Sequence, residues 1–405
     1  MTTTYQYSVR DRAGKLVSGS IAADSEALVV ARLKAMGYAP VSLTKSSAGL
    51  KKEIQIPGFG GRVKMKDLAV MSRQLATMIN AGLSLLRALT ILKEQTESKP
   101  LAAALTEVRN DVETGNALSS ALAQHPKVFP SLMVNMTKAG EVGGFLDSVM
   151  LQIADNYEAE VKLRGKVKSA MTYPVVVLCI AILGVIAMLL FVVPVFSKMF
   201  KTLGGKLPLP TQVLVDISHG LKILLPLVIV GGVTGVIVWS KVRMTPQVRG
   251  VVDPLKLKVP VFGSLFQKIA VARFARNLGT MMHSGVPILQ SLDIVADTTG
   301  NVVLAAAVRD VQTSVRSGES ITAPLSQHTI FPPMVTQMMA VGEDTGALDG
   351  MLAKIAQFYD QEIEATTESL TALIEPLMIA LLGGIIGSMI VALYLPIFKI
   401  FTLIS

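Results

Sequence analysis

The sequence is poor in the residues on which many catalytic and metal sites depend. It has one cysteine and four histidines in 405 residues, and aromatic residues make up only 5 %. A single cysteine excludes an intramolecular disulfide and argues against a thiolate metal site. Charged residues make up 17 %, below the share of about 25 % typical of soluble domains. Hydrophobic residues reach 51 % and the mean hydropathy is +0.53, so the composition predicts a membrane protein.

Motifs for nucleotide binding and catalysis are also missing. The "GGKL" at Gly204 lacks the earlier glycine and the following Ser or Thr of a phosphate-binding loop, and neither HExxH nor G-x-S-x-G occurs. The net charge of +9 is not gathered with aromatics into a surface for stacking bases, so anionic lipid is a simpler partner than nucleic acid. We therefore expect no catalytic residue, cofactor, metal or nucleic-acid partner.

Three apolar runs are long enough to cross a bilayer, which takes roughly 20 helical residues. Their uncharged stretches begin at Tyr173, Ile223 and Pro376. The second and third runs contain glycines four residues apart, a spacing that allows helices to pack closely in lipid. Interhelical packing and chance are equal alternatives for these glycines, which are Gly231, Gly235, Gly383 and Gly387.

An internal repeat organises the chain. The phrase "AGEVGGFLD" from Ala139 returns as "VGEDTGALD" from Val341, an offset of 342 − 140 = 202. The register continues into the apolar runs, where Pro174 matches Pro376 and Pro194 matches Pro396, and it shifts to 203 upstream. Each of the two units is therefore a soluble domain that leads into a membrane helix.

If both units fold alike, both soluble domains lie on one side of the membrane, and the unpaired second run supplies the extra crossing. Basic residues before the first span and after the second place these flanks in the cytosol. The third span is preceded by acidic residues, so its flanking charges do not predict an orientation. For this span we take the orientation that the repeat implies. We expect a cytosolic N-terminus and an extracytoplasmic C-terminus. The acids that precede the third span are Glu362, Glu364, Glu368 and Glu375.

Within the soluble units, apolar residues recur three and four apart, with breaks at glycine or proline. The expected fold is an all-α membrane protein with two repeated cytosolic helical bundles of about six helices each, three transmembrane helices and a small N-terminal α+β module. The boundaries we expect are a module at 1–45, a linker at 46–66, the first bundle at 67–172, spans at 173–196, 221–240 and 376–399, an extracytoplasmic loop at 197–220, the second bundle at 241–375 and a tail at 400–405.

The repeated phrase places two carboxylates six residues apart among glycines. We interpret it as structural: Gly140 ends one helix, a turn runs through Gly144, and an acid lies in the positive first turn of the next helix. A partner-binding loop and a metal site are the alternatives. The residues concerned are Gly140, Glu141, Gly144 and Asp147, with Gly342, Glu343, Gly346 and Asp349 in the second unit. Glu375, directly before Pro376, is equally a functional group or a solvated helix end.

Nearly the whole chain resembles the inner-membrane platform proteins of type IV pilus assembly and type II secretion, the PilC/GspF family. The signature is the stretch from Lys166 to Pro194, which contains Tyr173 and Pro174 and closes on Pro194. In the second unit Glu375 replaces the tyrosine. Other shared stretches are "RQLATMINAG", both glycine-acid phrases, "IEPLMI" and "ALYLPIFKI".

The resemblance implies a non-enzymatic platform that forms homo-oligomers and couples cytosolic hexameric ATPases to insertion or removal of pilins. Other implied partners are pseudopilins, further inner-membrane assembly proteins and membrane lipids. The sequence looks closer to pilus platforms than to the equivalent platform of a type II secretion system. A transporter is disfavoured because the spans lack a polar site near mid-membrane. A membrane enzyme that uses Glu141 or Glu343 is the remaining alternative.

Overall fold

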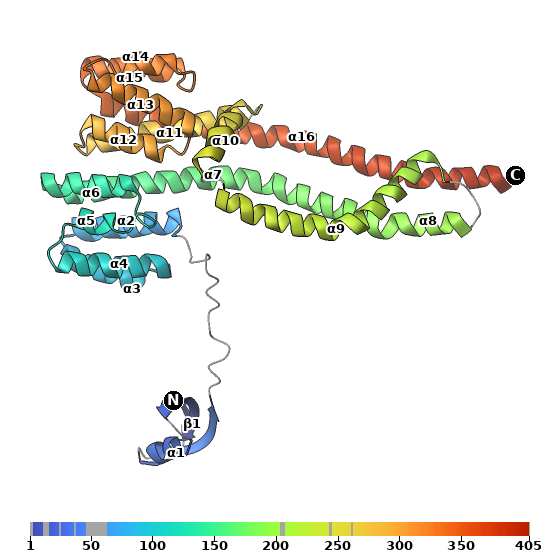
Figure 1. Cartoon of the computed structure of the whole chain (residues 1–405), viewed down its shortest axis with the longest axis horizontal. Coiled ribbons are helices and arrows are strands. Elements are labelled where there is room, and N and C mark those ends of the chain that lie inside the picture. Colours follow the sequence, from blue (N-terminus) through green and yellow to red (C-terminus); the bar gives the residue numbers. More distant parts are fainter. Residues whose placement is uncertain are drawn as a thin grey trace. The chain divides into compact units, whose positions relative to one another are not determined.

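The computed structural model describes residues 3–10, 16–23, 26–35, 38–45, 63–202, 207–242, 245–260 and 262–404. The chain divides into two compact units, Met1–Arg62 and Val63–Ser405, and each is described on its own (Figure 1).

The N-terminal unit is a three-stranded antiparallel sheet with one helix. Its elements are β1 (Thr3–Arg10), β2 (Leu16–Ala23), α1 (Glu26–Ala35) and β3 (Ala39–Lys45). The strand order is β2-β1-β3, and Tyr7 pairs with Gly19 on one side and Leu43 on the other. The helix buries Val29 and Leu33 completely. The predicted α+β module is confirmed, whereas residues 46–62 of the predicted linker lie outside the described residues.

Six helices follow in the first repeat of the larger unit. Their apolar residues lie on one face and are buried, as the helical period predicts. Positive φ angles at Gly82 (83°) and Gly115 (95°) mark two of the turns, a conformation that glycine adopts at little cost. The helices are α2 (Met65–Asn80), α3 (Leu85–Gln95), α4 (Lys99–Glu113), α5 (Leu118–Ala123), α6 (Ser131–Gly143) and α7 (Leu146–Ala187).

The second repeat has the same order of helices. One further helix, α10 (Pro246–Lys258), precedes it. The matching first residues of α12 and α3 differ by 288 − 85 = 203, and those of α16 and α7 by 348 − 146 = 202. The predicted pair of six-helix bundles is therefore confirmed. The helices are α11 (Phe262–His283), α12 (Ile288–Thr298), α13 (Val302–Arg316), α14 (Thr322–Gln327), α15 (Pro333–Thr345) and α16 (Leu348–Ile404).

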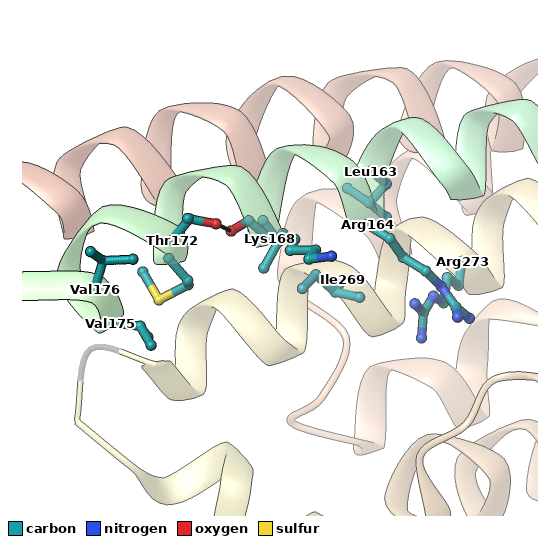
Figure 2. A pocket seen from close by; sticks show the side chains of 10 residues that line it. Leu163, Arg164, Lys168, Thr172, Val175, Val176, Ile269 and Arg273 are labelled. Carbon is teal, nitrogen blue, oxygen red and sulfur yellow. Dashed lines mark hydrogen bonds between the residues drawn. The ribbon is translucent and has the colours of Figure 1, made fainter. Parts of the chain in front are cut away.

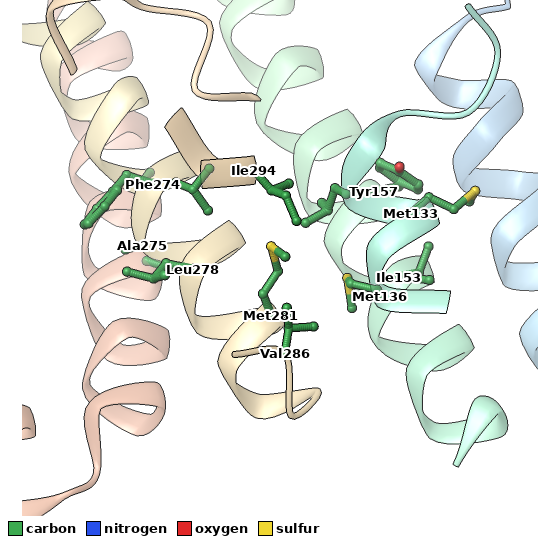
Figure 3. Packing of buried hydrophobic residues seen from close by; sticks show 14 of the residues in the cluster. Met133, Met136, Ile153, Tyr157, Phe274, Ala275, Leu278, Met281, Val286 and Ile294 are labelled. Carbon is green, nitrogen blue, oxygen red and sulfur yellow. The ribbon is translucent and has the colours of Figure 1, made fainter. Parts of the chain in front are cut away.

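The two bundles share one hydrophobic core. Buried residues from both repeats form a single cluster. In Figure 3, Met281 and Ile294 of the second repeat lie near Met136 and Tyr157 of the first. Burial of apolar surface is the main favourable contribution to such an interface. The repeats are therefore packed against each other directly.

Three helices are long and apolar enough to cross a membrane. The first is α7, which continues through a π-helical turn, η1 (Met188–Val192), into α8 (Val193–Thr202). The π turn ends two residues before Pro194, which has no N–H to donate to a helical hydrogen bond. The other two are α9 (Leu209–Val242) and the end of α16.

Helical structure extends further than the expected boundaries at two places. We predicted a loop at 197–220, but α8 continues to Thr202 and α9 begins at Leu209, with residues 203–206 outside the description. We predicted a short tail at 400–405, but α16 continues to Ile404. At the loop, the helices continue beyond the apolar run into polar residues, whereas at the tail the added residues 400–404 are themselves mostly apolar.

The membrane helices meet through hydroxyl groups and a small apolar cluster. Thr211 Oγ1 donates to the carbonyl of Ala392 at 2.5 Å, and Ser218 Oγ donates to the carbonyl of Leu189 at 2.6 Å. Both hydroxyls are buried, and such bonds hold helices together where water is absent. The buried apolar residues around them are Leu189, Val193, Val215, Met389 and Leu393.

Beyond this cluster, the apolar side chains of α9 are not covered by other described residues. Its most apolar stretch has no buried residue within the described part of the chain. A Cβ atom added at any glycine of the two spaced pairs would find no atom within 4 Å there. The described residues therefore form no close packing at Gly231, Gly235, Gly383 or Gly387, and contacts with another chain stay a prediction for these glycines.

Candidate functional site

The two glycine-acid phrases form equivalent turns between bundle and membrane helix. Gly144 follows α6 with φ 75°, and Gly346 follows α15 with φ 68°, both in the left-handed region. Asp147 and Asp349 then lie in the first turns of α7 and α16, where the helix dipole favours a negative charge. This part of the sequence prediction agrees with the structure.

The prediction for Gly140 is wrong, because this residue does not end its helix. Gly140 lies inside α6, which runs to Gly143, and Gly342 likewise lies inside α15. A Cβ atom at Gly140 would lie 3.0 Å from Val149 Cγ2, and one at Gly342 would lie 3.0 Å from the Cα of Leu348. Glycine suits both positions because the following helix passes so close that an added Cβ would force a neighbouring atom to move.

The glutamate of each phrase binds the beginning of an earlier short helix. Glu141 accepts hydrogen bonds from the backbone N–H groups of Leu118 (2.5 Å) and Ser119 (3.1 Å) at the start of α5. The sequence left open whether Asp147 or Glu141 lies in the first turn of the next helix; Asp147 does, and Glu141 binds the start of α5 instead. A carboxylate at a helix N-terminus satisfies N–H groups that have no partner within the helix.

Glu343 repeats this arrangement at the start of α14. It accepts from the backbone N–H groups of Ile321 (2.7 Å) and Thr322 (3.2 Å) and from Ser320 Oγ (2.9 Å). Partial burial raises the pKa of Glu343, but the hydrogen bonds from Thr322, Ile321 and Ser320 together outweigh it, so its pKa lies below the usual value. The repeated acid is therefore a capping group in both bundles.

A second repeated contact joins the first helix of each bundle to the long helix. Arg73 of α2 donates to Glu158 of α7 at 2.6 Å, and Arg276 of α11 donates to Asp360 of α16 at 2.5 Å. The arginines differ by 276 − 73 = 203 and the acids by 360 − 158 = 202, the offsets of the repeat. Our sequence analysis missed these pairs, although aligning the charged residues of the two units at those offsets would have found them.

A polar pocket of about 550 Å³ lies at the junction of α7, α11 and α16. His283 Nδ1 and Asp349 Oδ2 are 3.0 Å apart at its edge, and the hydrogen bond from His283 holds the pKa of Asp349 below its usual value. Arg276 also lines the pocket, and its buried Nη1 has no hydrogen-bond partner among the described residues. Asp349 thus joins α16 to α11 within the second repeat, and it lines the pocket that α7 of the first repeat also borders.

Charged groups also tie the repeats together. Glu160 of α7 accepts from Arg273 of α11 at 2.6 Å, and Asn156 donates to Asn277 at 3.2 Å. The Glu160 side chain is only 11 % exposed, so this pair is screened less by water than a surface pair. The long helix of the first repeat is therefore bound to the first helix of the second.

Near the membrane boundary α7 and α16 lie side by side. Lys166 Nζ is 2.5 Å from Glu364 Oε2, and a groove of about 560 Å³ between the helices includes Lys166, Glu368 and Glu375 in its lining. Tyr173 and Glu375, which are equivalent in the repeat, line one small pocket of about 50 Å³ together with Pro174. The structure therefore brings the signature tyrosine and its acidic replacement to the same place.

The remaining signature residues have backbone roles. Pro174 lies within α7, and Pro376 and Pro396 lie within α16. Each removes one hydrogen bond of its helix. Among the residues that the structure describes, no group of three or more His, Cys, Asp or Glu side chains could hold a metal ion. What the arrangement offers is two linked bundles with charged surfaces, attached without a break to membrane helices.

Comparisons with known proteins agree with this organisation. The family described as type II secretion system (T2SS), protein F, matches residues 71–194 and 274–396, one match for each repeat, and the N-terminal domain of that protein matches residues 1–44. Type IV pilus assembly protein PilC of Myxococcus xanthus is 44 % identical over 403 residues, covering 98 % of this chain and 95 % of the relative.

Type IV pilus assembly protein PilC of Thermus thermophilus is also 44 % identical, over 99 % of both chains. Type II secretion system protein F of Vibrio cholerae is 33 % identical, again over 99 % of both. The similarity therefore covers the module, both bundles and the membrane helices. The chain belongs to the family of type IV pilus assembly protein PilC and type II secretion system protein F.

Proposed function

We propose that this chain is the inner-membrane platform of a type IV pilus assembly machine, without catalytic activity of its own. It would couple cytosolic hexameric ATPases to the insertion of pilins into the pilus or their removal from it. The observation that carries the proposal is the full-length similarity to two pilus assembly proteins at 44 % identity, against 33 % for a secretion protein. The equivalent secretion platform is the alternative, and a transporter has no support.

The geometry supports a platform because bundle and membrane helix are one continuous element. Both α7 and α16 begin after a left-handed glycine turn in a bundle and continue into an apolar membrane segment. A motor that binds a bundle surface could thus act on the membrane helices without an intervening flexible loop. The exposed apolar surface of α9 offers an area for contact with lipids, pilins or a second copy of the chain.

We infer that both bundles are cytosolic. The inference rests first on the repeat and on the basic residues around the first two spans. It also rests on the acids before the third span, because two of them are bound by basic residues of the two bundles. Glu364 is paired with Lys166, and Glu362 with Lys268 at 2.8 Å, so these acids are partly neutralised and do not oppose a cytosolic location strongly. A reporter enzyme that is active only outside the cytosol should work when fused after Ser405 and fail when fused before Met1.

Deletion of the gene tests the function. Surface pili should disappear while secretion of folded exoproteins continues, and the unaltered gene should restore the pili. Persistent pili with lost secretion would instead assign the chain to a type II secretion system. The purified chain should hydrolyse no ATP by itself and should co-purify with a hexameric ATPase from the same cells.

A further inference from the structure

A pocket between α7 and α11, near the boundary between bundle and membrane, has one charged end and one apolar end. Its volume is about 480 Å³. Figure 2 shows Arg164 and Arg273 at one end and Val175 and Val176 at the other. The pocket is separate from the turns, from the polar pocket at the repeat junction and from the α7–α16 groove.

The charged end carries more cations than acids. Arg164 and Arg273 both donate to one carboxylate, that of Glu160, at 2.5 Å and 2.6 Å. Lys168 also lines the pocket and has no acidic partner among the residues that the structure describes. Three cations and one carboxylate leave an excess of two positive charges, so the pocket complements an anion.

The apolar end continues along the surface of α7 into the membrane segment. From Arg164 to Val175 the helix advances about 16 Å at about 1.5 Å per residue. Met171, Val175 and Val176 line this part from α7, and Ile269 lines it from α11. Val175 is 55 % exposed although it is apolar. This surface is suited to a hydrocarbon chain that lies parallel to the helix.

We propose that this pocket binds an anionic phospholipid. The headgroup phosphate lies between Lys168, Arg164 and Arg273, and one acyl chain follows Met171 and Val175 toward the membrane interior. Basic pockets beside membrane helices bind anionic headgroups in this manner. The inference needs only that α7 crosses a membrane, and it does not depend on a role in pili.

The chemistry of the lining favours a lipid over other anions. A free phosphate would use the cations but would leave the apolar end of the pocket empty. A zwitterionic lipid would fill the apolar part, but its headgroup carries a positive group of its own. That group would be repelled by a site that already has an excess of positive charge. Because α7 and α11 belong to different repeats, a bound lipid would also stabilise the contact between the two bundles.

Binding can be measured on the full-length chain in detergent after removal of bound lipid. We expect phosphatidylglycerol to raise the midpoint of thermal unfolding and to stay bound in native mass spectrometry, and phosphatidylcholine to do neither at the same concentration. Lys168→Gln should weaken phosphatidylglycerol binding about fivefold, the effect of roughly one basic residue near an anionic headgroup. Val175→Trp should weaken it without any change of charge, because the indole would occupy the apolar end.

Lys162→Gln is the matched control, because Lys162 lies on the same helix, is exposed and does not line the pocket. It should bind phosphatidylglycerol like the unaltered chain. Equal binding of the two lipids, or unchanged binding in both Lys168→Gln and Val175→Trp, would overturn the proposal. Full displacement of the lipid by millimolar inorganic phosphate would also overturn it, since the acyl chain would then contribute nothing.

Discussion

Helices α7 and α16 begin alike and become opposite in charge as they approach the membrane. Both start after a left-handed glycine, and both carry the acid that binds the arginine of α2 or α11. Further along, Lys162 and Lys166 of α7 occupy the positions of Glu364 and Glu368 in α16, since 364 − 162 and 368 − 166 both equal 202. Equivalent residues of the two repeats thus have the same charge at the contacts within each bundle. Nearer the membrane, where α7 and α16 lie side by side, equivalent residues have opposite charges.

The reversal has a physical reason. Two identical basic helices placed side by side would repel each other, whereas Lys166 and Glu364 attract across the contact. Lys268 of α11 binds Glu362 of α16 within the second repeat. Of the acids before the third span, Glu364 therefore serves the contact between repeats, and Glu362 serves a contact inside the second repeat.

The largest effect should come from filling the close approach that both repeats share. Gly342→Val should destabilise the chain by roughly 2–3 kcal/mol, because a β-branched side chain would collide with the backbone of Leu348. Gly140→Val should cost slightly less, since the atom nearest to its added Cβ belongs to the side chain of Val149 and the backbone Cα of Leu146 is 3.2 Å away. Chemical unfolding of the purified full chain measures both.

Gly165→Val is the control for these two substitutions. Gly165 lies in α7 with no atom within 4 Å of an added Cβ, so valine there should be neutral or slightly stabilising. An equal loss of stability at all three glycines would show that close approach is not the cause.

Removing the caps should have the next largest effect. Glu343→Ala should reduce the free energy of unfolding by about 1–2 kcal/mol, because the N–H groups of Ile321 and Thr322 lose their acceptor. Glu141→Ala should reduce the free energy of unfolding by less. Glu141 accepts two hydrogen bonds, whereas Glu343 accepts a further bond from Ser320. Asp344→Ala, one residue further and exposed without a bonded partner among the described residues, should be neutral.

The cap at Glu343 also predicts a dependence on pH. Because folding lowers the pKa of Glu343, its stabilising effect is complete above the unfolded value of about 4.3 and is lost as the pH falls through the folded value. The difference in stability between the unaltered chain and Glu343→Gln should therefore shrink below about pH 4. A constant difference from pH 7 to pH 3 would contradict a charged cap.

Exchanging the charges across the contact should have a smaller effect. Lys166→Glu alone should destabilise the chain by about 0.5–1 kcal/mol, because it places a carboxylate beside Glu364. Lys166→Glu combined with Glu364→Lys should restore most of this loss. A double-mutant cycle of unfolding free energies gives the coupling, and a coupling near zero would mean that the reversed charges do not join the repeats.

The smallest effect on stability is expected at Glu375, which stands in the second repeat where the first has the signature residue Tyr173. Glu375→Tyr makes the second repeat like the first at this point, and the exposed position should tolerate it within about 0.5 kcal/mol. If Glu375 contacts a partner, pili should be reduced although the protein is stable and abundant. Normal piliation would show that a carboxylate at this position is dispensable.

The sequence revealed the repeat, the helices and the three apolar runs because each is a pattern along the chain. It did not reveal what Glu141 binds, since its partners at Leu118 and Ser119 are 23 and 22 residues away and are backbone groups. The role of Gly140 was mistaken for a related reason. Glycine is required both in left-handed turns and in close contacts, and only the path of the following helix distinguishes the two.

The continuity of α7 and α16 has a mechanical consequence. A helix of 57 residues such as α16 is about 85 Å long, and its hydrogen bonds resist stretching and twisting along its length. A rotation imposed on a bundle is therefore transmitted to the far side of the membrane as the turning of a stiff rod. Bending is easiest where a proline interrupts the hydrogen bonds, at Pro174 and Pro376. Both helices can therefore bend at equivalent positions of the repeat, just where each enters its apolar segment.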